Sequence, residues 1–253
     1  MERFIIEGNR DLNGTIYVSG AKNAVLPAMS ACLLTKGKSV LHNVPDLIDI
    51  KTMSHLLRII GARVDYENGS MSIDSRDVCF SEAPYELVNK MRASIYVLGP
   101  LLARLKKARV SFPGGCAIGT RPIDLHLQAM ETLGAEISVD YGYINAKVKE
   151  LKGADIYFTK SSVGATINTL MAAVLAKGKT RIFNAAMEPE VDSTINLLNK
   201  MGAKINGRGT TTLEIEGVEE LIPIEMNMIP DRIEAGPFLI AGALSNNPVT
   251  VDN

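Results

Sequence analysis

Apolar residues recur at steps of three and four in three separate stretches of the chain, and a Gly-Ala pair follows each stretch. Such steps place the apolar side chains on one face of a helix. The three sets are Ile50, Met53, Leu57, Ile60; Ile123, Leu127, Met130, Leu133; and Val191, Ile195, Leu198, Met201. The glycines that follow, Gly61, Gly134 and Gly202, suit the left-handed position just past a helix end. The pattern therefore predicts three amphipathic helices, each ended by a glycine.

A β-hairpin is predicted after each of these helices. The Gly-Ala pair is followed each time by a charged residue and a β-branched one, and turn-forming residues come soon after. The expected turns lie at Asn68–Gly69, at Gly142 and at 207–209.

The segments before each amphipathic helix also match one another. Strands are predicted at 38–43, 108–113 and 179–184, apolar helices at 23–34, 92–105 and 163–176, and earlier strands at 15–18, 77–80 and 155–158. The repeated unit is strand, helix, strand, helix, strand, strand. This order predicts an α/β fold made of three such units.

The last part of the sequence reads as the start of a fourth unit. A strand is predicted at 224–228, a helix at 231–244 and a strand at 248–252. A strand and an apolar helix without further partners bury their apolar faces poorly. We therefore expect the chain to be the front part of a longer protein, the alternative being a domain with an irregular C-terminal extension.

Composition and charge exclude several classes of function. Of 253 residues, 46% are hydrophobic, which is enough for a large core. Lys and Arg (27) nearly balance Asp and Glu (28), Trp is absent and aromatic residues make up 5%, so a nucleic-acid binder is not expected. No signal peptide is recognised, and the apolar runs are too short to span a bilayer, so we expect a soluble cytoplasmic protein without membrane contact.

The three cysteines, Cys32, Cys79 and Cys116, are far apart and fit neither a disulfide framework nor a zinc motif. Cys32 and Cys79 lie in apolar segments and are predicted to be small core or strand residues. No metal site is predicted, and neither a P-loop nor a Gly-x-Gly-x-x-Gly motif occurs, so no cofactor is predicted either.

Only Cys116 lies in a setting that suits reactivity. Pro113 ends a strand, residues 114–121 contain three glycines, Cys116 and Arg121, and Pro122 is predicted to open a helix. A helix N-terminus beside Arg121 favours an anion, and cationic surroundings lower the pKa of a thiol. The alternative is a surface glycine loop that happens to contain a cysteine.

Two cations stand at predicted helix starts, Lys22 and Arg92. A cation opposes the helix dipole at this end unless an anion is present. If the three units pack around a pseudo-threefold axis, these helix starts lie at one common end and would bind a phosphate- or carboxylate-rich ligand. Ser94 and Asp231 are interpreted instead as ordinary N-caps, and His42 and His55 as structural residues.

Together these segments resemble the UDP-N-acetylglucosamine 1-carboxyvinyltransferase family along all 253 residues. The telling pieces are Ser-Gly-Ala-Lys22-Asn23-Ala, Arg92-Ala-Ser, Pro113-Gly-Gly-Cys116-Ala-Ile-Gly-Thr-Arg121-Pro-Ile-Asp-Leu-His126, Ser162-Val-Gly-Ala and Pro230-Asp-Arg-Ile-Glu-Ala-Gly236.

The resemblance implies two inside-out α/β barrels of three units each, with substrates held between them. Residues 21–229 would form one complete barrel, and 1–20 and 230–253 would be incomplete pieces of the second. The family's chain is longer, and its carboxylate base and several arginines belong to the part that is absent here. The resemblance therefore implies that this chain alone does not turn over and that its partner is the missing C-terminal domain of the same chain.

The implied reaction moves the enolpyruvyl group of phosphoenolpyruvate to the 3-hydroxyl of UDP-N-acetylglucosamine and releases phosphate, the first committed step of peptidoglycan synthesis. Cys116 would be the acid, with Lys22 and Arg121 as further catalytic residues and Arg92 as a ligand of the substrate's negative charge. The other implied substrate-binding residues are Asn23, Tyr96, Pro122, Ile123, Asp124, Leu125, His126, Lys160, Ser161, Ser162, Val163 and Gly164.

Other functions remain open at this point. A 5-enolpyruvylshikimate-3-phosphate synthase would share the fold and phosphoenolpyruvate, but the Cys116 loop and the segment from Asp124 to His126 argue against it. A non-catalytic nucleotide-sugar-binding domain is a second alternative, and a purely structural α/β repeat protein is a third.

Overall fold

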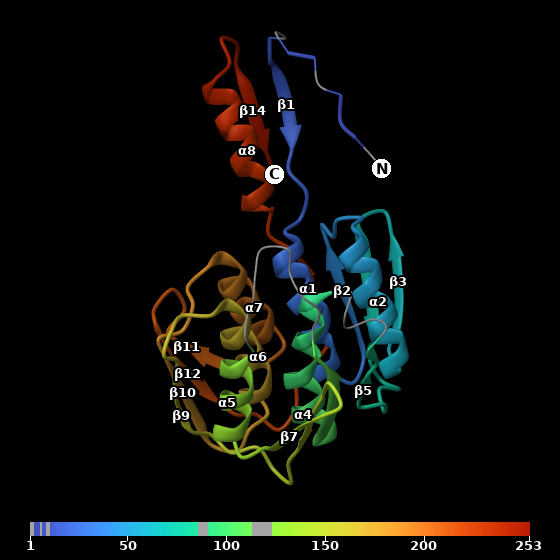
Figure 1. Ribbon diagram of the computed structural model, residues 1–253, viewed down its shortest axis with the longest axis vertical. Helices are drawn as coiled ribbons and strands as arrows, with labels where there is room; N and C mark the ends of the chain where they lie inside the picture. The colour runs from blue at the N-terminus through green and yellow to red at the C-terminus, as the bar shows by residue number, and fades with distance from the viewer. Residues whose placement is uncertain (1–2, 6, 9–10, 86–90, 113–122) are drawn as a thin grey trace.

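The computed structural model describes residues 3–5, 7–8, 11–85, 91–112 and 123–253. It has a wide body and a narrow extension at one end (Figure 1). The extension consists of β1 (Gly14–Tyr17), α8 (Arg232–Ala243) and β14 (Val249–Asp252), and β1 pairs with β14 in parallel. Segments 14–17 and 249–252, far apart in the sequence, therefore pair outside the body.

Within the described residues, the body contains three four-stranded sheets with the same strand pairing. In strand order they are β13 (Glu225–Asn227), β2 (Lys38–His42), β4 (Ser70–Asp74), β3 (Arg63–Glu67); β5 (Glu82–Ala83), β6 (Lys107–Ser111), β8 (Tyr143–Lys147), β7 (Glu136–Asp140); and β9 (Asp155–Tyr157), β10 (Lys179–Phe183), β12 (Thr212–Glu216), β11 (Lys204–Asn206). In each sheet a parallel pair is followed by two antiparallel pairs. The threefold repetition predicted from the sequence is thus present in the strand pairing.

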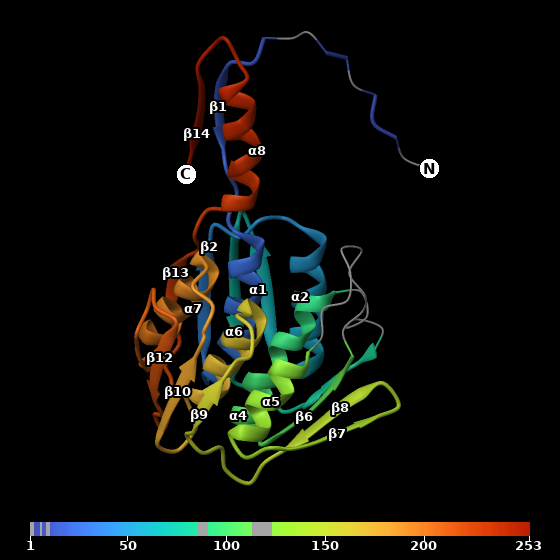
Figure 2. The same ribbon diagram turned by 60° about the vertical axis from the view of Figure 1, so that its left-hand side comes forward.

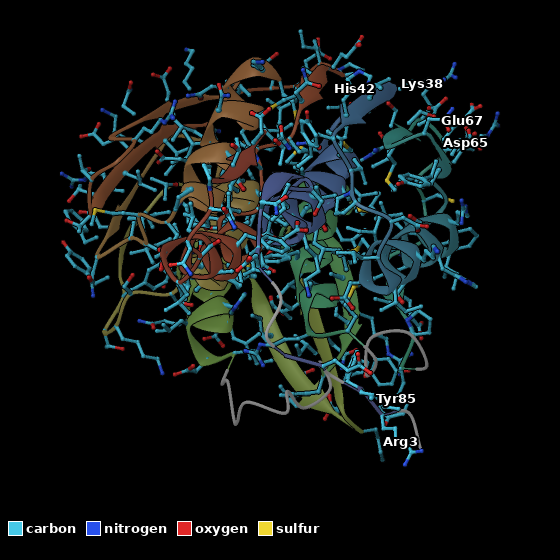
Figure 3. All side chains as sticks on the ribbon, turned by 90° about the horizontal axis from the view of Figure 1, so that it is seen from above. Arg3, Lys38, His42, Asp65, Glu67 and Tyr85 are labelled. Carbon is cyan, nitrogen blue, oxygen red and sulfur yellow. The ribbon has the colours of Figure 1, made fainter. Side chains whose placement is uncertain are left out.

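The helices form two sets in the body. The first set is α1 (Lys22–Ala31) with η1 (Cys32–Leu34), η2 (Arg92–Val97) with α4 (Leu98–Leu105), and α6 (Val163–Ala173). The second set is α2 (Ile48–Ile60), α5 (Asp124–Thr132) and α7 (Pro189–Lys200). Seen from the side, the first set lies in the middle of the body, with the sheets outside it (Figure 2); Figure 3 shows the same body from above. The predicted α/β class is confirmed.

The sequence explains which helices are central. In α6 every residue from Ala165 to Ala173 is buried, and in α1 every residue from Ala24 to Ala31. Both helices have mostly small and apolar residues on all sides, which suits a helix enclosed by others. By contrast α2 buries Ile50, Met53, Leu57 and Ile60 along one face and exposes charged residues on the other, as its period predicts.

The predicted glycine ends and hairpin turns are confirmed. Gly61, Gly134 and Gly202 have φ values of 107°, 99° and 101°, which L side chains rarely adopt. The turn between β3 and β4 lies at Asn68 and Gly69, both with positive φ. Positive φ at both central residues gives the turn a twist that matches the flanking strands.

One predicted strand is wrong. Residues 77–80 are not a strand; the backbone N–H groups of Cys79 and Phe80 instead donate to the carbonyl of Ile60 at the end of α2 (3.4 and 3.2 Å), and pairing with β6 begins only at β5. Cys79 is therefore exposed rather than buried, which corrects the prediction. The prediction for Cys32 is confirmed, and burial raises the pKa of its thiol to about 12.

The first sheet takes a strand from the far end of the body. Residues 224–228 were expected to open a fourth unit, but β13 pairs in parallel with β2 and completes the first sheet. The strand expected first in the first unit, β1, pairs with β14 instead. His42 Nε2 lies 2.7 Å from Glu225 Oε1 across this junction, and His42 and Lys38 lie at the outside of the body (Figure 3).

The extension joins the body through two adjacent segments. Ala21 N donates to Ile229 O and Asp231 N donates to Ser19 O, both at 2.8 Å. No residue of α8 is buried, and Leu239 is 61% exposed. Within the described residues, the helices are too short or too polar to cross a membrane.

Candidate functional site

Lys22 is the first residue of α1, and its charge is paired. Its Nζ lies 2.9 Å from Oδ2 of Asp49, an acidic residue in the first turn of α2. This carboxylate supplies the negative charge that the position of Lys22 calls for at a helix N-terminus. Both side chains remain partly accessible, at 38% for Lys22 and 29% for Asp49, and Asn23 beside them is exposed.

A second group of predicted residues meets where η2, α5 and α6 pack together. A Cβ placed on Gly164 would lie 3.0 Å from His126 Nε2 and 3.9 Å from the Tyr96 hydroxyl. Arg92, at the start of η2, is close enough for its charge to act on both Tyr96 and His126. We call the group Arg92, Tyr96, His126 and Gly164 the polar corner.

His126 is held neutral in the polar corner. The side chain is buried, and burial together with the positive charge of Arg92 lowers the pKa of the imidazole to about 4, while Asp124 opposes the shift. Its Nδ1 lies 3.1 Å from Nδ2 of Asn168. A neutral imidazole has one N–H donor and one acceptor nitrogen. His126 therefore offers hydrogen bonds of defined direction at the polar corner and no positive charge.

Tyr96 is also a neutral group. It packs partly buried against the core, and burial raises the pKa of its phenol to about 12. The charge of Arg92 lowers that pKa and the charge of Glu190 raises it. Near neutral pH the Tyr96 hydroxyl can therefore donate or accept a hydrogen bond at the polar corner.

The N-terminus of α6 borders the polar corner. Ser162 is its N-cap and accepts a hydrogen bond from Ala165 N at 3.3 Å. Lys160 and Ser161 are exposed, and Val163 is half-buried. Free backbone N–H groups of a first helical turn favour anions.

The start of α5 differs in detail from the sequence prediction. The helix begins at Asp124, with Ile123 at its N-cap position. The side chains of Ile123 and Leu125 are buried in the core, whereas Asp124 is exposed. Ser94 is buried and its hydroxyl donates to Met91 O, so it is not the N-cap that was expected, while Asp231 is one for α8.

Three of the predicted residues, Cys116, Arg121 and Pro122, lie outside the described residues. Lys22 and Asn23 lie at the start of α1, where Lys22 is paired with Asp49. The structure thus brings together Arg92, Tyr96, His126 and Gly164, with Ser162 beside them.

Sequence reasoning missed three polar residues of this region. Asp49 pairs with Lys22, and Glu190 in the first turn of α7, although only 3% exposed, binds Arg232 Nε and one terminal nitrogen at 3.1 and 3.2 Å. Both acids stand at helix starts, where they favour the dipole, and this signal was available in the sequence. Asn168 lies within the apolar helix α6 and contacts His126. A lone amide in such a helix was the signal for it.

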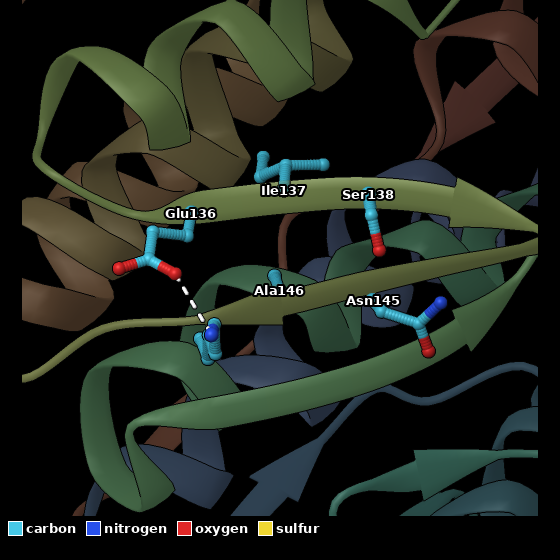
Figure 4. A pocket seen from close by; sticks show the side chains of 6 residues that line it. Glu136, Ile137, Ser138, Asn145 and Ala146 are labelled. Carbon is cyan, nitrogen blue, oxygen red and sulfur yellow. Dashed lines mark ion pairs between the residues drawn. The ribbon is translucent and has the colours of Figure 1, made fainter.

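A depression in the surface lies elsewhere, on the second sheet. A depression of about 330 Å³ is lined by six residues of the hairpin β7–β8, where Glu136 and Lys147 form an ion pair at 2.8 Å (Figure 4). None of the predicted site residues is among these six. The chemistry of the candidate site therefore does not coincide with this depression.

A model of the EPSP synthase (3-phosphoshikimate 1-carboxyvinyltransferase) family matches residues 6–253. The chain belongs to this family. It is 58% identical over 254 residues to a UDP-N-acetylglucosamine 1-carboxyvinyltransferase of Chloroherpeton thalassium, covering 99% of this chain and 59% of that protein. It is 52% identical to one of Desulfosudis oleivorans, covering 100% and 61%. The resemblance inferred from the sequence is confirmed, and these relatives are enzymes by name.

Two solved structures show the same fold. The enolpyruvyl transferase NikO from Streptomyces tendae superposes with a TM-score of 0.87 at 24% identity, over 97% of this chain and 59% of that one. An EPSP synthase from Acinetobacter baumannii gives 0.76 at 18%, over 97% and 56%. The chain spans about three-fifths of the length of the curated relatives it matches.

Proposed function

We propose that this chain forms part of an enzyme that transfers the enolpyruvyl group of phosphoenolpyruvate to the 3-hydroxyl of UDP-N-acetylglucosamine and releases phosphate. The observation that carries the proposal is the 58% identity, along 99% of the chain, to a relative of that name. In this proposal residues 21–229 form a complete three-unit inverse barrel. Residues 1–20 and 230–253 belong to a second barrel completed by a C-terminal domain, and the protein acts in the cytoplasm.

The reaction adds a proton at C3 of phosphoenolpyruvate while the sugar oxygen attacks C2 and gives its own proton to a carboxylate base, which the resemblance assigns to the C-terminal domain. Phosphate then leaves C2 as a proton leaves C3, and this restores the C=C bond of the enolpyruvyl group. In the proposed mechanism the Cys116 thiol supplies the proton that is added at C3, because the pKa of a thiol is readily tuned near neutrality. Lys22, Arg121 and Arg92 bind the phosphate and carboxylate and stabilise their charge as it redistributes.

The pairing of Lys22 gives this mechanism a further element. Its Nζ is already 2.9 Å from Asp49, so a phosphate that binds Lys22 must share or displace that carboxylate. Displacement costs the ion pair but leaves Asp49 partly accessible to water, at 29% exposure. We propose that Asp49 keeps Lys22 extended along the helix start until the anionic substrate arrives.

The polar corner and the start of α6 are proposed to hold the nucleotide sugar. Gly164 has no Cβ, and a Cβ there would come within 3.0 Å of the His126 ring, so glycine at this position lets the start of α6 lie close to the imidazole. Ser162 and the first N–H groups of α6 suit phosphate oxygens. Asn23, Lys160, Ser161, Val163 and the run Arg121 to Leu125 complete the proposed nucleotide-sugar site.

The proposal is tested on the 253-residue chain by calorimetric titration and by mass spectrometry. We expect UDP-N-acetylglucosamine to bind and shikimate 3-phosphate not to bind. We also expect the epoxide fosfomycin to form one covalent adduct with the chain. The adduct should be absent in Cys116→Ser and present in the control Cys79→Ser, because the Cys79 thiol is exposed but lies outside the site. An adduct that maps to Cys79, or tighter binding of shikimate 3-phosphate, would contradict the proposal.

Two alternatives are separated by the same experiment. EPSP synthase activity is favoured by the description of the matching family, but the solved EPSP synthase is only 18% identical, which speaks for the fold alone. Binding of shikimate 3-phosphate would favour that activity. Binding of the nucleotide sugar without a Cys116 adduct would favour a non-catalytic binding domain.

A further inference from the structure

Asn168 is the central polar residue of the buried helices. It lies in α6 with no exposed surface, and its side chain contacts three other segments. Its Nδ2 donates to Ile95 O of η2 at 2.9 Å, its Oδ1 accepts from Gly99 N of α4 at 2.8 Å, and its Nδ2 also lies 3.1 Å from His126 Nδ1. A side-chain amide has two donors and one acceptor atom, and all are engaged.

These partners fix the orientation of the Asn168 amide. The backbone N–H of Gly99 can only donate and the carbonyl of Ile95 can only accept, so oxygen must face Gly99 and nitrogen must face Ile95. The second N–H of Nδ2 then points to His126 Nδ1, which must accept. An accepting Nδ1 carries no proton, so the proton of the neutral imidazole is on Nε2.

The Nε2 atom faces the polar corner. A Cβ on Gly164 would stand 3.0 Å from Nε2, and the Tyr96 hydroxyl borders the same space. Nε2 has no hydrogen-bond partner within the part of the chain that the structure describes. The charged groups that act on the ring are Arg92 of η2, which favours the neutral form, and Asp124 of α5, which opposes it; Tyr96 is neutral.

We propose that Asn168 is a positioning residue that holds His126 as the Nε2–H tautomer and directs that N–H toward the N-terminus of α6, where it donates to an oxygen of the bound nucleotide sugar. The identity of the ligand rests on the function proposed above, whereas the tautomer does not. Neither residue takes part in proton transfer in this proposal, because a directional donor needs to stay protonated.

Nitrogen-15 NMR of the histidine rings in the 253-residue chain tests the tautomer directly. In the wild-type chain we expect His126 Nδ1 to resonate in the unprotonated range and Nε2 in the protonated range at neutral pH, with His126→Gln assigning the signals. In Asn168→Asp the carboxylate can only accept, so the proton moves to Nδ1 and His126 titrates at higher pH. Asn168→Ala removes the donor without adding charge, and both tautomers become populated.

Thr169→Val is the matched control. Thr169 is the next residue of α6 and is fully buried, and its hydroxyl has no hydrogen-bond partner within the described residues. The control therefore changes a buried polar side chain of the same helix without touching His126, and it should leave the nitrogen signals as in wild type. Loss of packing alone would affect both variants, whereas the tautomer responds only to Asn168.

Binding of UDP-N-acetylglucosamine tests the role of the donor. Misdirecting one hydrogen bond to a charged oxygen is expected to weaken binding about tenfold or more in Asn168→Asp and not in Thr169→Val. A proton on Nδ1 in wild type, or unchanged nitrogen signals in Asn168→Asp, would overturn the assignment. Equal binding by wild type and Asn168→Asp would overturn the positioning role. If wild type has the expected tautomer but binds no nucleotide sugar, the function proposed above fails and the tautomer stands.

Discussion

Helices α6 and α8 are alike in sequence and opposite in environment. Both are small, apolar and capped by a polar side chain, Ser162 for α6 and Asp231 for α8. In α6 every residue from Ala165 to Ala173 is buried, whereas α8 has no buried residue and stands outside the body (Figure 1). The local sequence forms a helix in both cases. An apolar helix surface stabilises the fold only where neighbouring elements bury it, by about 25 cal/mol for each Å² removed from water.

The largest test of this contrast replaces one leucine in each helix. Leu170 in α6 is fully buried, and Leu239 in α8 is 61% exposed. Leu170→Ala is expected to lower the free energy of unfolding by about 2–5 kcal/mol, because it removes buried surface and leaves a cavity. Leu239→Ala is expected to change it by less than about 0.5 kcal/mol. Urea unfolding followed by circular dichroism measures both, and equal losses would mean that α8 is covered in solution.

A pH titration of stability probes the polar corner of the body. The folded pKa of His126, about 4, lies below its ordinary value of 6.5, so the unfolded chain binds the proton first as the pH falls. The contribution of the neutral His126 to the free energy of unfolding is therefore fully present above pH 6.5. It is lost as the pH falls from 6.5 to 4, by on the order of 3 kcal/mol in total. Comparing urea midpoints of wild type and His126→Gln from pH 7 to 4 isolates this contribution.

The control for that titration is His55→Gln. His55 lies on α2 and is exposed, so this variant should keep the wild-type loss of stability with falling pH. A His126→Gln chain that loses stability as steeply as wild type would show that the imidazole is not held neutral.

The junction between the two regions is tested by Arg232→Ala. The substitution leaves the Glu190 carboxylate, 3% exposed, without the arginine that binds it through two nitrogens. Because Arg232 itself is half exposed, we expect a loss of about 1–3 kcal/mol rather than the larger cost of a fully buried pair. Backbone amides of α8 should exchange with deuterium about tenfold faster or more, and those of α6 should not change.

Arg208→Ala is the matched control at this junction. Arg208 pairs with Asp192 of the same helix α7 at 3.2 Å, but the pair is more exposed. Its removal should leave the exchange of α8 unchanged. Faster exchange of α8 in both variants would point to a general loosening of α7.

The smallest effects are expected at the two N-caps. Asp231 accepts from Ile233 N at 2.8 Å and Glu234 N at 3.3 Å, and Ser162 accepts from Ala165 N at 3.3 Å. Either change to alanine should cost about 1 kcal/mol. In Asp231→Ala the loss should be confined to amide exchange in the first turn of α8, because that helix can fray alone. In Ser162→Ala it should appear in global unfolding, because α6 is enclosed.

Much of the body could be predicted because its signals are local. The helix periods, the glycines at their ends and the turn at Asn68–Gly69 each depend on a few neighbouring residues. The strand predicted at 77–80 has a fitting pattern, but those backbone groups bond to the end of α2 instead. The pairing of β13 with β2 depends on residues about as far apart as the body allows, and no local pattern encodes it.

The candidate site could be predicted only as a set of residue types. A charge at a helix start pointed to Lys22, yet its partner Asp49 comes from another helix. The side chains of His126 and Tyr96 lie beside Gly164 because three helices pack at one place, which no spacing in the sequence specifies. Asn168 was overlooked because the role of a buried amide depends on its hydrogen-bond partners, which here lie on η2, α4 and α5.

The strand β13 has a consequence for how the protein is made. Synthesis runs from the N-terminus, so the β3–β4 hairpin and β2 leave the ribosome long before residues 225–227 exist. Until then one edge of β2 has backbone groups without a strand to bind, and such an edge invites pairing with other chains. The nascent chain must keep that edge protected while the other two sheets are translated, and the first sheet can be completed only after residues 225–227 have left the ribosome.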